Sequence, residues 1–239
     1  MVDQPVSGNL PSLLSTTIRR SIVLGRLFLG IGIAYPVILT LALSASGESS
    51  FDSSIPLLIP VFAVLGSMGA MVAFSNDRMK GVFEYLIAYG VSPRSLFACF
   101  LIASLAVMSI LVGVSVALTL CVSLAVWHTV PVGLLGPLCL YSVPMSYASA
   151  SLACMVGMYW TVLSSPREGM NSQIGLMPVV GIAPSIITLV VVGIVAASYG
   201  EGAILVVLGI ALAIIIGLAL TLLSQVGRLL RCERLLSPM

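Results

Sequence analysis

Charged side chains are scarce in this chain: Asp, Glu, Lys and Arg make up only 8% of its 239 residues. A soluble domain carries about 25% charged residues, so too few are present here to cover a surface that faces water. Apolar residues account for 59% of the chain, and its mean hydropathy is +1.20. This composition excludes a disordered chain and indicates that lipid is its solvent. The net charge of +2 is too small to indicate a nucleic-acid partner.

Residues that carry chemistry are equally rare. His128 is the only histidine. A metalloprotease needs several His and acidic ligands, and one histidine near a helix end does not reach serines deep in other helices. The five cysteines form no CxxC pair, and no Gly-x-x-x-x-Gly-Lys-Ser/Thr motif occurs, which excludes ATP binding through a Walker motif. We therefore expect no catalytic residue and no metal site, and we expect His128 at the membrane interface.

Long runs without a formal charge lie between the few charged residues. Four of them hold 21, 24, 32 and 26 residues, and each fits one membrane helix of about 20 residues. The fifth run, 95–166, has 72 residues and must hold two helices, because a single one would be about 108 Å long. The pattern predicts an all-α integral membrane protein with one transmembrane domain over residues 1–239. The six predicted spans lie near residues 23–46, 54–75, 95–126, 138–163, 176–198 and 203–226.

The basic residues give the expected orientation. If the N-terminus is cytoplasmic, all ten basic residues fall on the cytoplasmic side. The charged residues of the outer loops are then Glu48, Asp52 and Glu201, all acidic. The positive-inside rule then predicts a multi-pass protein of the plasma membrane with both termini in the cytoplasm. The ten basic residues are Arg19, Arg20, Arg26, Arg78, Lys80, Arg94, Arg167, Arg228, Arg231 and Arg234.

The N-terminal residues 9–22 have the spacing of an amphipathic helix, with Leu10, Leu13 and Ile18 on its apolar side. We expect this helix to lie in the cytoplasmic membrane interface before the first span. The alternative is that it simply extends the first span into water.

The connection between the second and third predicted spans, residues 76–94, predicts a short amphipathic helix. We expect Asn76 to cap its start and Gly90 to end it, with Ser92 and Pro93 beginning the next helix. Such a helix is either a solvated connector or a segment that docks into a groove of a soluble partner. Its expected apolar face consists of Met79, Val82, Phe83, Leu86 and Ile87.

This segment resembles the corresponding part of the permease subunits of ABC transporters of the type-2 exporter class. In that family it commonly reads Glu-Arg-Glu-Arg-Gly-Thr-Leu-Glu, followed by leucines and Pro-Val-Ser-Arg. Residues 164–168 and 176–178 also look like the family's pattern, whereas the outer connection 198–202 is shorter than in many members. The matching residues here are Asp77-Arg78-Met79-Lys80-Gly81-Val82-Phe83-Glu84, then Leu86, Ile87 and Gly90-Val91-Ser92.

The resemblance implies a transport subunit that is not itself an enzyme. Segment 76–94 would contain the coupling helix, which contacts a separate ATP-binding subunit, and that subunit would bind ATP and Mg. Export would follow a path along a dimer interface with a second permease copy or a paralogue. The residues that the resemblance assigns to coupling are Asp77, Arg78, Lys80, Gly81, Phe83, Glu84, Leu86 and Ile87.

Hydroxyl groups gather in the predicted fourth span. They either line a substrate path or make ordinary helix–helix contacts, and small residues such as Gly66 and Gly69 in the second span predict close packing too. The candidates for the path are Tyr141, Ser142, Ser146, Tyr147 and Ser149.

Two other functions are compatible with the sequence. One is a six-span scaffold or assembly protein that binds a soluble partner through residues 76–94 without transport. The other is a facilitator for a neutral substrate. The uncharged middles of the spans argue against a proton-coupled secondary transporter, because ion and proton relays need ionisable groups within the membrane.

Overall fold

The computed structural model describes residues 10–46, 51–127, 138–163 and 201–229, together with short pieces between 182 and 198. Within these ranges the chain is helical apart from the turns at 80–81 and 89–92. The prediction of an all-α protein is confirmed for this part of the chain. His128 and most of the predicted fifth span, 176–198, lie outside the described residues.

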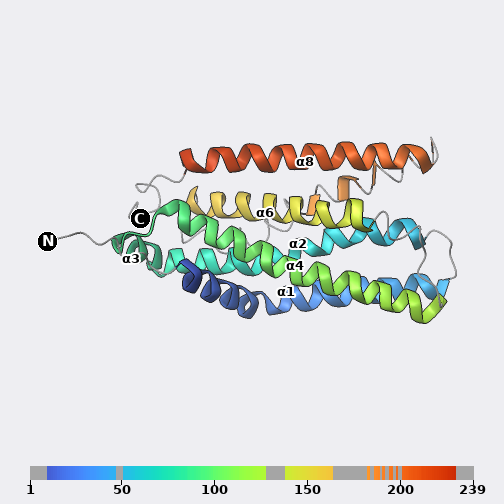
Figure 1. Ribbon diagram of the computed structural model, residues 1–239, viewed down its shortest axis with the longest axis horizontal. Coiled ribbons are helices and arrows are strands. Elements are labelled where there is room, and N and C mark those ends of the chain that lie inside the picture. Colours follow the sequence, from blue (N-terminus) through green and yellow to red (C-terminus); the bar gives the residue numbers. More distant parts are fainter. Residues whose placement is uncertain are drawn as a thin grey trace.

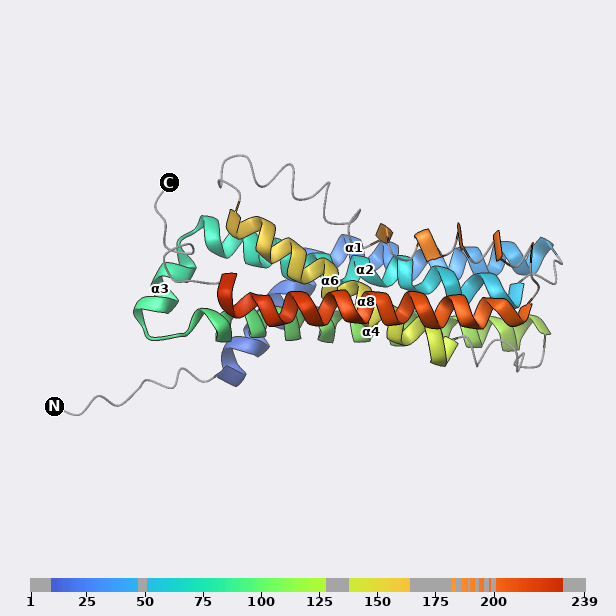
Figure 2. The ribbon, with the colours of Figure 1, turned by 90° about the horizontal axis from the view of Figure 1, so that it is seen from above.

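In the described ranges five long helices run side by side, and a short helix joins two of them at one end of the bundle (Figure 1). That short helix is α3 (Val82–Ala88), and we refer to this end as the α3 end. Helix α1 begins there, and α2, α6 and α8 end there (Figures 1 and 2). The π-helix η1 (Leu138–Ser142) leads directly into α6. The long helices are α1 (Leu10–Ser46), α2 (Phe51–Met79), α4 (Pro93–Trp127), α6 (Val143–Leu163) and α8 (Glu201–Leu229).

Three stretches of the described helices are long and apolar enough to cross a membrane: Ile59–Met79, Pro93–Val122 and Val206–Ser224. By length and composition the chain is therefore a multi-pass membrane protein. The bounds of α2, α4 and α8 extend the predicted spans by one to four residues at each end, and η1 with α6 covers 138–163. The number of six spans stays a prediction.

Helix α1 is continuous over 37 residues. The expected interfacial segment 9–22 and the expected first span 23–46 are thus, from Leu10 onward, parts of one helix. Its first turns run obliquely to the long axis of the bundle, and its later turns follow that axis (Figure 2). The interfacial position of the oblique turns stays a prediction.

The basic residues of the described helices lie toward one end of the bundle. Basic positions occur in the early turns of α1, at the end of α2, at the start of α4 and at the end of α8, all toward the α3 end. Asp52 and Glu201 stand at the starts of α2 and α8, at the opposite end. This is the distribution that the positive-inside rule expects of a bundle whose α3 end faces the cytoplasm.

Helix α2 is the centre of the bundle and α8 its edge. Helix α2 packs against α1, α4 and α6, and 67% of its apolar stretch is buried, against 11% of that of α8. Helix α8 packs mainly on α6 and exposes apolar side chains such as Ile210 and Ile214. Lipid or another membrane helix has to cover a surface of this kind.

Two glycines let α1 and α2 cross at very short range. A Cβ atom added to Gly69 would stand 2.2 Å from the carbonyl oxygen of Ser21, and one added to Gly25 would stand 2.8 Å from the Cα of Gly69. Neither position accepts a side chain unless the helices move apart. Small residues permit such backbone contact between membrane helices, so the packing role predicted for Gly69 is confirmed.

Candidate functional site

A sharp turn at Gly81 separates α3 from α2. Gly81 has φ +69°, in the left-handed region, where a side chain costs about 1–2 kcal/mol. Its N–H donates to the carbonyl of Arg78 at 3.1 Å, and this bond closes the end of α2. Its carbonyl accepts from the N–H of Tyr85 at 3.3 Å, and this bond begins α3. The prediction that Asn76 caps the short helix is therefore wrong. Asn76 and Asp77 belong to the last turn of α2, because the glycine breaks the helix after them.

The other end of α3 is a Schellman turn. The N–H of Val91 donates to the carbonyl of Leu86 at 3.0 Å, and the N–H of Gly90 donates to that of Ile87 at 2.9 Å. Gly90 has φ +86°, which confirms its predicted role as the stop. Ser92 Oγ then accepts from the N–H of Ser95 at 3.1 Å and so caps α4 as expected.

The inner face of α3 is fixed by an aromatic cluster. Phe83 is 2% exposed, and its ring centroid lies 4.8 Å from that of Phe74 in α2 and 6.0 Å from that of Phe100 in α4. Leu86 and Ile87 pack against the same core cluster. Burying a phenylalanine contributes about 1.5–3 kcal/mol. Since Phe83 contacts both neighbouring helices, α3 is held against the ends of α2 and α4 together.

The outer face of α3 presents two aromatic residues that sequence analysis missed. Tyr85 and Tyr89 are 64% and 56% exposed. Their hydroxyl groups lie 3.0 Å apart, and their ring centroids lie 4.7 Å apart. The sequence held a signal for this pair: the two tyrosines are four residues apart on the face opposite Phe83, and side chains at i and i+4 meet on a helix.

The hydrogen bond with Tyr89 raises the pKa of Tyr85, and partial desolvation adds to this effect. The Tyr85 phenol therefore stays neutral at physiological pH. Glu84, also exposed, adds a negative charge beside the pair. The outer face thus combines two tyrosine side chains with one carboxylate, and exposed tyrosines of this kind are enriched at protein interfaces.

Two of the predicted coupling residues point to neighbouring helices. Asp77 is 4% exposed and accepts two hydrogen bonds from the Arg20 guanidinium of α1. Arg78 is half-buried and donates to the carbonyl of Val162 in α6 at 3.3 Å. These contacts tie the end of α2 to α1 and α6.

The eight predicted coupling residues therefore fall into three groups around one turn and one short helix. Lys80 and Glu84 are exposed, while Gly81 forms the turn. The remaining five face the bundle: Asp77, Arg78, Phe83, Leu86 and Ile87.

The candidate path residues lie in η1 and α6. Four of them are buried inside the bundle, namely Tyr141, Ser142, Ser146 and Ser149. Ser146 Oγ donates to the carbonyl of Ser142 at 2.6 Å, a bond internal to the helix. Tyr147 is partly exposed, and its hydroxyl lies 2.6 Å from Ser109 Oγ of α4. A role for these residues in a path stays a prediction.

Within the described ranges no group of three or more His, Cys, Asp or Glu residues is placed to hold a metal ion. No family model, no curated protein and no solved structure matches this chain. The resemblance to type-2 exporter permeases consequently stays a hypothesis that depends on residues 77–92 and the layout of the helices.

Proposed function

We propose that this chain is the permease subunit of an ATP-driven ABC transporter of the exporter class. It would have six transmembrane helices, both termini in the cytoplasm and a place in the plasma membrane. A separate ATP-binding subunit would bind ATP and Mg and dock on α3. A second copy or a paralogue would complete a dimer, with the substrate path along the interface between the two permeases.

The observation that carries the proposal is the construction of α3. It is a short helix at the end of the bundle, with an inner face anchored by Phe83 and an outer face that exposes Glu84, Tyr85 and Tyr89. A plain connector needs no exposed aromatic pair. A docking helix needs both a rigid anchor and an exposed face with large side chains.

The same construction supports transmission of motion. A push on the outer face of α3 reaches α2 and α4 at once, because Phe83 packs against Phe74 and Phe100. From the end of α2 it reaches α1 through Asp77 and α6 through Arg78. Closure of two ATP-binding subunits would thus move four helices as bodies, the kind of rigid switch known for domain closure.

The alternative function is a six-span scaffold that binds a soluble partner through the same face without transport. A facilitator for a neutral substrate is the third possibility. Both differ from the proposal in having no requirement for ATP.

The experiment is co-purification of the tagged chain with the ATP-binding chain encoded beside it, followed by reconstitution into inverted vesicles and assays of substrate uptake. The proposal predicts association and uptake that requires ATP, and it predicts that Glu84→Arg weakens the association and lowers the uptake. Glu84 is exposed, so this substitution leaves the fold intact, which thermal unfolding checks. Association without ATP-dependent uptake would support the scaffold, and uptake that is independent of ATP would support the facilitator.

A further inference from the structure

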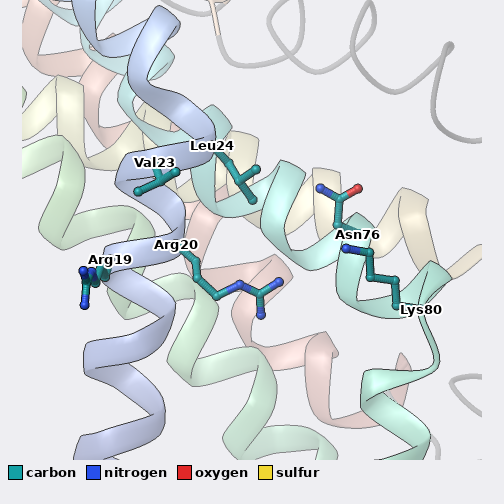
Figure 3. A pocket seen from close by; sticks show the side chains of 6 residues that line it. All are labelled: Arg19, Arg20, Val23, Leu24, Asn76 and Lys80. Atoms are coloured by element: carbon teal, nitrogen blue, oxygen red, sulfur yellow. The ribbon is translucent and has the colours of Figure 1, made fainter.

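A cavity of about 270 Å³ lies between α1 and α2 at the α3 end (Figure 3). Half of the described residues that line it are basic. Figure 3 shows Arg20 extending from α1 toward α2, where Lys80 lies close to Asn76. The lining residues are Arg19, Arg20, Val23, Leu24, Asn76 and Lys80.

The charge around the cavity is strongly positive. Arg20 is neutralised by Asp77. Arg19 and Lys80 are exposed, and neither makes an ion pair within the part of the chain that the structure describes. Among the described residues, two positive charges without an ion pair therefore border the cavity, one from each helix, and the amide of Asn76 adds a neutral hydrogen-bond donor.

An apolar stripe of α1 leads away from the cavity. It begins with Leu24 and continues at spacings of three and four residues on one helical face. From Leu24 to Ile38 the helix rises about 21 Å at 1.5 Å per residue, more than the ~15 Å depth of one leaflet. The exposed members of the stripe are Leu24, Leu27, Ile31, Tyr35 and Ile38.

We propose that this cavity binds the headgroup of an anionic phospholipid, whose acyl chain lies along the apolar stripe of α1. With the α3 end at a membrane surface, Arg19 and Lys80 would lie near the level of the lipid phosphates. A volume of about 270 Å³ is below the range of about 300–1,000 Å³ for drug-sized ligands and suits a headgroup alone. Basic pockets between membrane helices bind acidic headgroups in this manner.

The proposed lipid connects α1 with α2, because residues of both helices line the cavity that would hold its headgroup. It adds to the contact that the Arg20–Asp77 pair already makes. The lipid site does not depend on the proposed transport function, since it requires only that the α3 end lie at the surface of a membrane.

The test measures binding of phosphatidylglycerol to the purified full chain by native mass spectrometry. Phosphatidylcholine serves as the zwitterionic comparison and glycerol phosphate as the soluble headgroup. The double variant Arg19→Gln/Lys80→Gln removes both unpaired cations. The matched control Arg26→Gln/Arg94→Gln removes two exposed basic residues outside the cavity, so both variants have the same net charge.

We expect phosphatidylglycerol to bind in preference to phosphatidylcholine and to raise the thermal unfolding temperature. The double variant should bind it about 25-fold more weakly, because each basic residue near an anionic surface contributes a factor of about five. The control double variant should stay close to the unmodified chain. Equal losses in the two double variants, or no preference for phosphatidylglycerol, would overturn the proposal. Glycerol phosphate that binds as tightly as the lipid would also overturn it, because the site would then serve a soluble phosphate.

Discussion

The guanidinium of Arg20 binds the carboxylate of Asp77 through two hydrogen bonds, with Nη1–Oδ2 at 2.9 Å and Nη2–Oδ1 at 2.5 Å. The two partners are unequally buried, since the Asp77 side chain is 6% exposed and the Arg20 side chain 40%. The pair joins the early turns of α1 to the last turn of α2, directly before the turn at Gly81. It therefore positions the helix ends beside α3.

Removing Arg20 should be more harmful than removing Asp77. Arg20→Gln leaves a buried carboxylate without its partner, at a cost of about 2 kcal/mol or more, whereas Asp77→Asn leaves a guanidinium that can turn to water. The double variant Arg20→Gln/Asp77→Asn should recover part of the loss, since two neutral amides can hydrogen-bond. Thermal unfolding in detergent measures all three variants. A larger loss for Asp77→Asn than for Arg20→Gln would contradict the burial on which this order depends.

Gly69→Ala should disrupt the bundle, because the new Cβ would stand 2.2 Å from the carbonyl oxygen of Ser21. The clash involves backbone on both sides, so α1 and α2 must separate. The control is Gly30→Ala, where no atom lies within 4 Å of the added Cβ and alanine favours the helix by about 1 kcal/mol. Thermal unfolding should show a clear loss for Gly69→Ala and a small gain for Gly30→Ala. Equal effects at the two positions would rule out the close crossing.

The loss of stability on substituting Gly81 should depend on how well the new residue tolerates a φ of +69°. Space is available there, since the nearest atom to an added Cβ is the Glu84 Oε2 at 3.8 Å, so backbone strain sets the cost. We expect Gly81→Asn to be mild, Gly81→Ala to cost about 1–2 kcal/mol, and Gly81→Val to cost the most. Unfolding temperatures in this order support the turn. A stable Gly81→Val variant would indicate a continuous helix from α2 into α3.

Substitutions at Phe83 and Tyr85 should differ in their effect on the free energy of unfolding, because Phe83 is buried and Tyr85 is exposed. Phe83→Ala empties the aromatic cluster with Phe74 and Phe100 and should cost about 3–5 kcal/mol. Tyr85→Ala removes a side chain that is 64% exposed and should change the unfolding free energy by less than about 0.5 kcal/mol. Denaturation followed through tryptophan fluorescence distinguishes the two. If Tyr85→Ala unfolds the protein as readily as Phe83→Ala, the two faces of α3 have been assigned incorrectly.

The sequence predicted α2, α4 and α8 well because the cause of a membrane helix is local. Uncharged runs of about 20 residues form membrane helices whatever their neighbours are, and the bounds of α2, α4 and α8 lie within four residues of those expected. The end of α3 was predictable for a similar reason, since Gly90, Ser92 and Pro93 act within one turn. The start of α3 was mispredicted, because Asn76 and Asp77 look like a helix cap. The residue that breaks the helix is Gly81, five residues after Asn76.

The contacts between helices could not be predicted from the sequence. Arg20 and Asp77 are 57 residues apart, and nothing in their local patterns identifies them as partners. The resemblance assigned Asp77 and Arg78 to coupling, and the structure adds that they contact α1 and α6. Tertiary packing decided which face of each helix is buried, and it left Tyr85 and Tyr89 as the exposed pair of α3.

Docking of a separate ATP-binding subunit on the outer face of α3 is tested by the affinity of that subunit for the chain in lipid nanodiscs. The affinity is compared between the unmodified chain and the variant Glu84→Arg/Tyr85→Ala. We predict binding weaker by about thirtyfold, as expected when about 2 kcal/mol of central contacts is lost, with an unchanged unfolding temperature. Unchanged affinity in the variant would contradict this docking.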